Sequence, residues 1–218
     1  MKKYLIASSL LVGCISSPLF AEESKGFYLS VGGGLNAVSE VEGDVGADGF
    51  SFDTNSPFQY SFAIGKEFED WRLEFNYSAS TVSSDSFTVT PAGQNSQTAA
   101  LEPELEVDVA NYMLYGYKTF SNDTKFTTYI GAGLGMSSLD VPAQNIAVGG
   151  ANVPLPAVDE QVFTIGVKGG VDYEIAENTS LYSEVGYLNL SSFESDDGQE
   201  EYDSINAFTI GAGLRFSF

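Results

Sequence analysis

The chain has 218 residues, with 30 acidic and 9 basic side chains and a formal net charge of −21. This charge argues against nucleic acid as a partner, because phosphate binding needs a basic surface. Histidine is absent, so the chain lacks the imidazole base on which serine or aspartate hydrolysis usually relies. A chain of this length holds one all-β barrel or two small domains.

Residues 1–21 have the composition of a secretory signal peptide. A basic start is followed by a short apolar run, and the small residue Ala21 precedes a polar segment. We expect cleavage after Ala21 and a single barrel domain over residues 22–218. No helix-length apolar run occurs after the signal, which excludes a helical membrane protein.

The only cysteine, Cys14, lies inside this segment. A chain cleaved after Ala21 has no thiol, no disulfide and no thiolate metal site. A second interpretation starts from Leu11-Val12-Gly13-Cys14, which resembles a bacterial lipobox and would make Cys14 the lipidated first residue. Intact mass distinguishes the two.

Apolar residues alternate with small or polar ones through the rest of the chain, as in strands, whose side chains point to opposite faces with a period of two. Eight strands are predicted, over residues 26–36, 58–68, 71–79, 105–120, 125–137, 162–175, 180–190 and 204–218. Short turns over residues 69–70, 121–124 and 176–179 alternate with long polar loops over residues 37–56, 80–104, 139–160 and 191–203. The pattern predicts an all-β fold: an eight-stranded, antiparallel, up-and-down transmembrane β-barrel with short periplasmic turns and long acidic extracellular loops.

The last strand shows the alternation most clearly. One apolar row runs to the chain end and contains Phe208, Ile210, Ala212, Leu214, Phe216 and Phe218. On a soluble edge strand this row would be an aggregation hazard, which disappears if it faces lipid. The strand over 105–120 is the least regular, because its apolar row also contains Asn111. A bulge that changes its register remains open.

The second row of each strand decides which side faces lipid. A lipocalin-like barrel would place its apolar row inward and a charged row in water. Here the second row is mostly Gly, Ser, Thr, Ala and Tyr, and small residues fit the crowded interior of an eight-stranded barrel. We therefore expect the apolar row to face lipid.

A few isolated charges interrupt the inward row, namely Arg72, Glu74, Lys168, Asp172, Glu184 and Arg215. Buried charges must be paired, so we expect a salt-bridge network inside the barrel. The network is then either structural packing or the gate of a narrow ion path. Planar-bilayer conductance separates these interpretations.

Aromatic residues gather at strand ends near the expected periplasmic rim, where amphipathic rings favour the headgroup level. They are Phe27, Phe68, Trp71, Tyr117, Phe120, Phe126, Tyr173, Phe216 and Phe218. In a soluble core such rings would be expected near strand centres.

The predicted loops contain acidic residues and no lysine or arginine. The first and last loops carry most of this acidic surface, including Glu40, Glu42, Asp44, Glu194, Asp196, Asp197, Glu200 and Glu201. Such loops repel neighbouring anionic lipopolysaccharide, with divalent cations lowering the repulsion, or they bind a basic surface ligand. The run Ser195-Asp196-Asp197-Gly198 lacks the ligand spacing of an EF-hand, so any calcium binding would be diffuse and weak.

Three strand motifs carry a resemblance to a known family. They are Tyr129-Ile130-Gly131-Ala132-Gly133-Leu134-Gly135, Glu184-Val185-Gly186-Tyr187 and Leu214-Arg215-Phe216-Ser217-Phe218. They resemble small eight-stranded OmpA-like barrels of the outer membrane, and within them the opacity-protein and surface-antigen group of porin-like proteins. Leu188-Asn189 stands where this group often has Arg-Tyr, which puts the family's inward arginine in doubt at this point.

The resemblance implies a non-enzymatic integral protein of the Gram-negative cell outer membrane with no cofactor. Barrel enzymes of this membrane, such as the omptin proteases, use histidine. It also implies that Ile210, Leu214, Phe216 and Phe218 form the C-terminal signal that the barrel-assembly machinery reads. Expected roles are envelope structure and adhesion or recognition through the acidic loops, among lipid and lipopolysaccharide. The alternative is a narrow porin-like channel for small solutes or ions.

Overall fold

The computed structural model describes residues 26–148, 151–155, 157–194 and 201–218. The predicted signal peptide with Cys14, and the acidic residues Asp196, Asp197 and Glu200, lie outside these ranges. Within them there is no helix long and apolar enough to cross a membrane.

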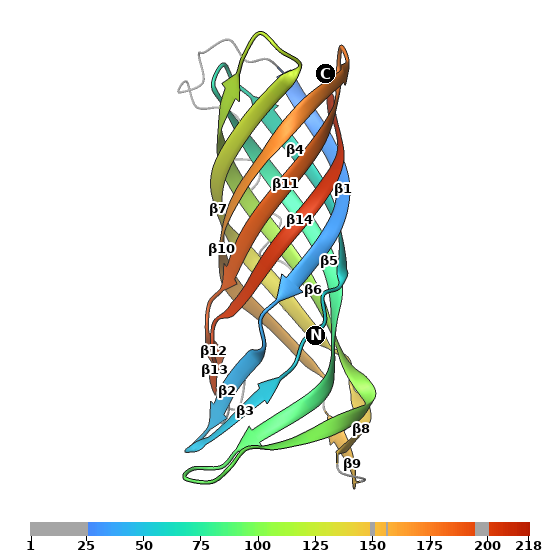
Figure 1. Cartoon of the computed structure of the whole chain (residues 1–218), viewed down its shortest axis with the longest axis vertical. Coiled ribbons are helices and arrows are strands. Elements are labelled where there is room, and N and C mark those ends of the chain that lie inside the picture. The colour runs from blue at the N-terminus through green and yellow to red at the C-terminus, as the bar shows by residue number, and fades with distance from the viewer. Residues whose placement is uncertain (1–25, 149–150, 156, 195–200) are drawn as a thin grey trace, which may run out of the picture.

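Long antiparallel strands form a closed ring in the part of the chain that the structure describes (Figure 1). In order they are β1 (Gly26–Val38), β4 (Phe58–Glu67), β5 (Trp71–Thr90), β6 (Gln97–Ser121), β7 (Phe126–Val141), β10 (Val158–Ala176), β11 (Thr179–Leu190) and β14 (Ile205–Ser217). Each strand pairs with the next one in this order. The predicted eight-stranded up-and-down barrel is confirmed.

The ring closes between the first and last strands. β1 and β14 pair in continuous register. Beyond this ladder the Phe27 amide donates to the Phe218 carbonyl oxygen (3.1 Å), and the Phe218 amide donates to the Phe27 carbonyl oxygen (2.8 Å). Closure leaves no open strand edge in the ring, which is the condition for a sheet to sit in lipid.

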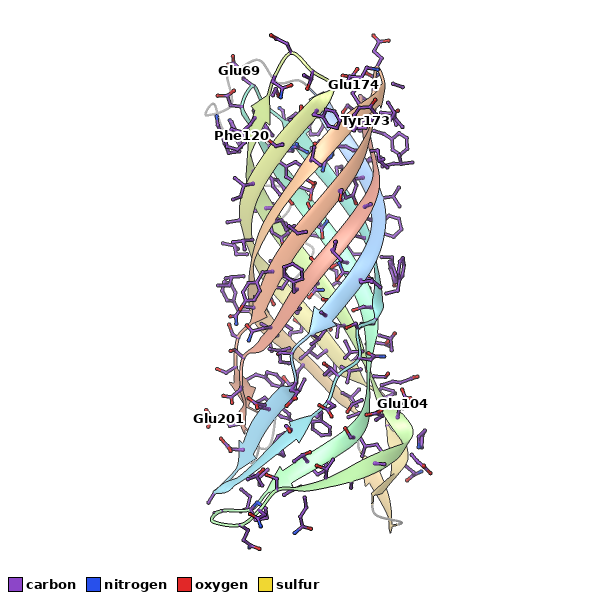
Figure 2. All side chains as sticks on the ribbon, in the orientation of Figure 1. Glu69, Glu104, Phe120, Tyr173, Glu174 and Glu201 are labelled. Atoms are coloured by element: carbon purple, nitrogen blue, oxygen red, sulfur yellow. The ribbon has the colours of Figure 1, made fainter. Side chains whose placement is uncertain are left out.

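The two ends of the barrel differ. The short connections and the C-terminus lie at one end, here named the turn end, which is at the top of Figure 1. Figure 2 labels Glu69 and Glu174 at the turn end, and Glu104 and Glu201 toward the opposite end, here named the hairpin end. The hairpin end holds β2 (Val41–Val45), β3 (Asp48–Phe52), β8 (Gln144–Val148), β9 (Ala151–Leu155), β12 (Phe193–Glu194) and β13 (Glu201–Tyr202).

Much of the hairpin end is paired strand, whereas the sequence predicts polar loops there. β5 and β6 continue beyond the barrel as one long hairpin. β3 pairs with β5 and β2 pairs with β13, so parts of the first, second and last predicted loops form one sheet. The physical reason is aromatic packing across strands: the Phe87 ring lies 4.8 Å from Phe52 and 6.3 Å from Phe50, centroid to centroid.

An apolar band surrounds the middle of the barrel. Its side chains are exposed on the outer face of the ring strands, for example Leu29, Phe62, Ile130, Ile165 and Ile210. A continuous apolar surface of this kind would be an aggregation liability in water, but in a bilayer it meets acyl chains. The prediction that the apolar row faces outward is confirmed for the ring strands other than β6, and the lipocalin-like orientation is wrong. On β6 the prediction is wrong, because the row with Met113, Tyr115 and Tyr117 faces inward.

Aromatic rings border this band. Most of the rings predicted at the rim are exposed at the turn end, as Phe120 and Tyr173 are in Figure 2. Two of the predicted rim residues are instead buried. Tyr117 points into the barrel because its hydroxyl donates to Glu74 (3.1 Å), and Phe68 stacks on Trp71 with ring centroids 3.8 Å apart.

The row of β6 that holds Asn111, Met113, Tyr115 and Tyr117 faces the interior. Tyr115 is 0% exposed, whereas Leu114 on the other row is 47% exposed. On β6 the row predicted as apolar is therefore the inward one, because its tyrosine rings fill the lumen beside small residues of β7. The register of this strand is regular where the sequence left a bulge open, since β5 and β6 pair without interruption from residue 105 to 118 of β6. The register shifts just outside this range: Ser84 pairs with Leu105 and Ser86 with Ala100, so residues 101–104 of β6 lie opposite one residue of β5.

Candidate functional site

All six charged residues predicted for the interior point into the barrel. Arg72 and Glu74 come from β5, Lys168 and Asp172 from β10, Glu184 from β11 and Arg215 from β14. Strand alternation places each of them on the inward row, and the ring brings strands distant in sequence together. The charges on these side chains balance, with three basic and three acidic groups.

Asp172 is the centre of this lumen network. Its Oδ2 lies 2.7 Å from Nη2 of Arg72, and its Oδ1 accepts a hydrogen bond from Nη1 of Arg215. Arg215 also faces Glu74, with Nη2 3.8 Å from Oε2. Arg72 is 1% exposed and Arg215 is 4% exposed, so both guanidinium groups depend on these carboxylates for their neutralising charge.

A second ion pair lies beside the first group. Lys168 Nζ is 3.0 Å from Oε1 of Glu184, and the Tyr129 hydroxyl donates to Oε2 of the same carboxylate (3.1 Å). The cavity next to this pair measures about 30 Å³, which is room for about one water molecule. The space beside the Lys168–Glu184 pair is therefore narrow.

Tyrosine rings fill the remaining cross-section. Tyr28 donates its hydroxyl to Glu74 (2.7 Å), and its ring lies 4.9 Å from the guanidinium carbon of Arg215. The Arg72 guanidinium lies 4.6 Å from the centre of the Tyr129 ring. These cation–π contacts combine with the ion pairs and make the lumen a packed polar core.

Glycines on the facing strands make space for the rings. A Cβ on Gly170 would lie 2.6 Å from Cζ of Tyr129, and a Cβ on Gly65 would overlap the ring of Tyr28. The expectation that inward glycines let tyrosines lie across the lumen is met at these positions. The glycines in the second row of the predicted strands were the sequence signal for this packing.

The residues of the predicted C-terminal signal lie on the outer face of the barrel. Ile210, Phe216 and Phe218 are exposed there, and Leu214 is partly exposed. They are available to lipid along one ridge of β14. Their recognition during assembly stays a prediction.

The hairpin end contains a feature that sequence reasoning missed, an apolar cavity of about 410 Å³. Residues from the inward rows of the strand ends line it, including Val107, Val109, Leu139, Leu190 and Ile205. A sequence signal existed: close to the predicted loops the inward rows change from Gly, Ser and Tyr to Val, Leu and Ile. Such a change indicates an apolar space above the ionic part of the lumen.

A polar layer forms the floor of this apolar cavity. Asn111 donates from Nδ2 to Ser78 (3.2 Å) and accepts at Oδ1 from Ser137 (2.6 Å), and Ser137 lies 2.7 Å from Thr164. All four side chains are buried. The layer separates the apolar cavity from the lumen network.

Acidic residues are paired with one another across strands at the hairpin end. In what we name the first acidic ladder, Asp140 on β7 pairs with Asp108 on β6 and with Asp159 on β10, and all three are exposed. In the second acidic ladder, Glu201 on β13 pairs with Asp44 on β2 and with Glu194 on β12.

The other predicted acidic residues lie close to the second ladder along the chain. Glu42 lies in β2 and Glu40 just before it, and both are exposed. In the part of the chain that the structure covers, no group of three or more potential ligands is arranged to hold a metal ion. These carboxylates therefore form an extended charged surface.

Comparison with known proteins places this geometry in a family. The model of the outer membrane protein beta-barrel domain matches residues 7–216. The outer membrane protein PagN of Salmonella typhimurium is 34% identical over 115 residues, which are 51% of this chain and 48% of PagN. The match thus spans about half the length of that relative.

Solved structures show the same fold. Neisserial surface protein A superposes with a TM-score of 0.59 at 16% identity, over 90% of this chain and 100% of the other. OprG from Pseudomonas aeruginosa superposes with a TM-score of 0.56 at 11% identity, over 90% of this chain and 99% of the other. Because the family model covers nearly the whole chain, this protein belongs to the outer membrane protein beta-barrel domain family and resides in the Gram-negative outer membrane.

Proposed function

We propose that this protein is a non-enzymatic surface protein of the outer membrane that recognises a basic ligand or surface through its hairpin end. The observation that carries the proposal is the pair of acidic ladders, in which acidic residues are paired with acidic residues on adjacent strands. The proposal places the hairpin end outside the cell.

Like charges directly opposite each other destabilise a sheet. The segments that build the hairpin end contain no lysine or arginine to relieve this repulsion. In the first ladder a neutral group, the Thr81 hydroxyl, donates a hydrogen bond to Oδ1 of Asp108 (2.6 Å). A cationic partner relieves the repulsion on contact, so the ladders favour basic ligands and disfavour anionic ones.

The hairpins also hold the charges at defined positions before any partner arrives. Asn55 donates from Nδ2 to Ser83 Oγ (2.7 Å) and accepts from the Ser83 amide (3.0 Å), which ties the segment before β4 to β5. Ser86 donates to Asp53 (2.9 Å) across the same junction. A surface that is ordered in advance loses less conformational entropy on binding.

The interior supports a structural role for the lumen network. Its charges are paired and buried, the sequence contains no histidine, and the rings of Tyr28, Tyr117 and Tyr129 occupy the cross-section. The alternative of a narrow channel has no comparable support. Planar-bilayer recordings on the purified protein are expected to show no single-channel steps.

Divalent cations are a second class of positive partner that the ladders favour. At the membrane surface they would bridge these carboxylates to the anionic groups of lipopolysaccharide. Binding of this kind is diffuse, since the described carboxylates form no closed coordination group.

The test is adhesion of intact cells to a polylysine-coated surface. Cells that display the wild type are expected to adhere more than cells without the protein, and added salt is expected to remove this extra adhesion. The variant with Asp108→Asn, Asp140→Asn and Asp159→Asn is expected to lose most of the extra adhesion. A matched control removes as many acidic groups at the turn end, with Glu69→Gln, Glu174→Gln and Glu177→Gln. Equal adhesion by the ladder variant and the wild type would refute the proposal.

A further inference from the structure

We propose that the apolar cavity at the hairpin end binds one molecule of a long-chain aliphatic alcohol or amine. This site is separate from the acidic ladders, because it lies inside the wall of strands and the ladders lie outside it. Recognition of a basic surface does not require the cavity to be occupied, so either proposal can fail alone.

The size and lining of the cavity fit a small apolar ligand. Its volume is about 410 Å³, and small-molecule sites commonly measure roughly 300–1,000 Å³. Val107, Val109, Leu139 and Leu190 form part of the wall, and Phe50 and Val41 come from the overlying hairpin. Water in such a space has few hydrogen-bond partners, whereas an aliphatic chain gains dispersion contacts on every side.

The shape of the site favours a chain that enters from the hairpin end and stops. The hydrogen-bonded layer of Asn111, Ser137 and Thr164 closes the floor, and the buried Met113 and Tyr115 lie beyond it. A molecule in the cavity therefore has no open continuation toward the lumen network.

One polar atom in the cavity has no partner. Asn36 lines the cavity and is 3% exposed, and its Oδ1 accepts no hydrogen bond from any described residue. A buried acceptor without a donor costs free energy, which a bound donor recovers. Hydroxyl and ammonium groups donate hydrogen bonds, whereas an ionised carboxylate only accepts them.

The charge around the entrance points to the same head groups. Glu40, Glu42, Asp44 and Glu201 are exposed on the surrounding hairpins, and their negative potential repels a fatty-acid anion or a phosphate. Phe50 and Tyr202 pack edge to face beside the entrance, with centroids 5.4 Å apart. Such rings also attract an ammonium group through their faces.

The experiment uses the full mature chain in lipid nanodiscs and three photoreactive probes. These are dodecanol, dodecylamine and dodecanoate, each with a diazirine at the end of the chain, and labelled sites are mapped by peptide mass spectrometry. The alcohol and the amine are expected to label the segments around Val109 and Leu139 saturably, and unlabelled ligand is expected to compete. Labelling of the outer band, for example at Leu134 or Ile210, is expected to rise without saturation and serves as the internal reference for probe dissolved in lipid.

Variants test the location and the head group. Ala207 is buried and lines the cavity, so Ala207→Phe is expected to abolish saturable labelling. The matched control is Ala110→Phe, on the outward row of β6, which is expected to leave it unchanged. Val41→Trp fills the cavity from β2, outside the ring, and covers the case in which Ala207→Phe does not fold. Asn36→Leu is expected to weaken alcohol and amine binding roughly tenfold.

Dodecanoate is expected to saturate at roughly tenfold higher concentration than the amine, because the acidic surface repels it. If dodecanoate saturated labelling at the same concentration as the amine, the assignment of the head group would be overturned. Labelling confined to the outer band, or saturable labelling that survives both Ala207→Phe and Val41→Trp, would overturn the site itself.

Discussion

The lumen network allows a quantitative test in which two substitutions are less harmful than one. Asp172 pairs with both Arg72 and Arg215, and these two arginines are almost fully buried. Asp172→Asn keeps the side-chain shape and removes the carboxylate that lies closest to both guanidinium groups. Removing one partner of a buried ion pair costs about 3–5 kcal/mol of the free energy of unfolding.

The expected loss for Asp172→Asn lies at the lower part of this range. Glu74 lies 3.8 Å from Arg215, and Glu67 lies 3.8 Å from Arg72, so each arginine keeps a weaker partner. The double variant Asp172→Asn with Arg72→Met restores the balance of one arginine and one carboxylate. It is expected to be more stable than Asp172→Asn alone by at least about 1 kcal/mol, as a coupling between contacting residues.

The assay is urea unfolding in lipid vesicles. The single tryptophan of the chain, Trp71, stacks on Phe68 at the turn end and reports the transition by fluorescence. Far-ultraviolet circular dichroism is the second probe, and coincident transitions justify a two-state treatment. The control Glu177→Gln removes an exposed acidic group and is expected to change stability by less than about 0.5 kcal/mol. If the double variant lost as much free energy of unfolding as the two single variants together, the paired network would be refuted.

Further outcomes are expected from the band, the glycines and the chain end. Ile210→Arg places a charge in the apolar band and is expected to cost about 2–4 kcal/mol near the bilayer midplane, measured by the same unfolding assay. Gly65→Val is expected to cost about 1–3 kcal/mol by overpacking against Tyr28, whereas Gly116→Ala, whose Cβ meets nothing within 4 Å, is expected to be neutral or slightly stabilising. Phe218→Ala is expected to slow assembly in cells and to leave refolding into vesicles nearly unchanged. Equal effects in both settings would count against an assembly signal.

The sequence was most informative about the strands of the barrel. Alternation is a local property, because successive side chains of a strand always point to opposite faces. The row with Leu29 and Val31 and the row with Ile210 and Phe216 could therefore be assigned to lipid before any pairing was known. The small residues of the opposite row decided the orientation, since only a filled narrow barrel needs them there.

β6 shows where this reasoning fails. Its inward row carries Met113, Tyr115 and Tyr117, which a hydrophobicity pattern does not distinguish from a lipid-facing row. Their environment depends on the partners across the ring. Tyr117 is inward because Glu74 on β5 accepts a hydrogen bond from its hydroxyl and because Gly131 on β7 leaves space for its ring. These partners come from other strands, so the pattern of β6 alone cannot identify them.

By itself, the sequence determined the class of fold, the number of ring strands, the residues of the inward charges and the absence of basic residues at the hairpin end. The tertiary structure decided which charges meet, which face of β6 is inward, and that the predicted loops form paired hairpins. It also revealed the acidic ladders and the apolar cavity. The physical reason is that alternation follows from the geometry of one strand, whereas neighbours across the ring follow from register and closure, which only the complete set of strands defines.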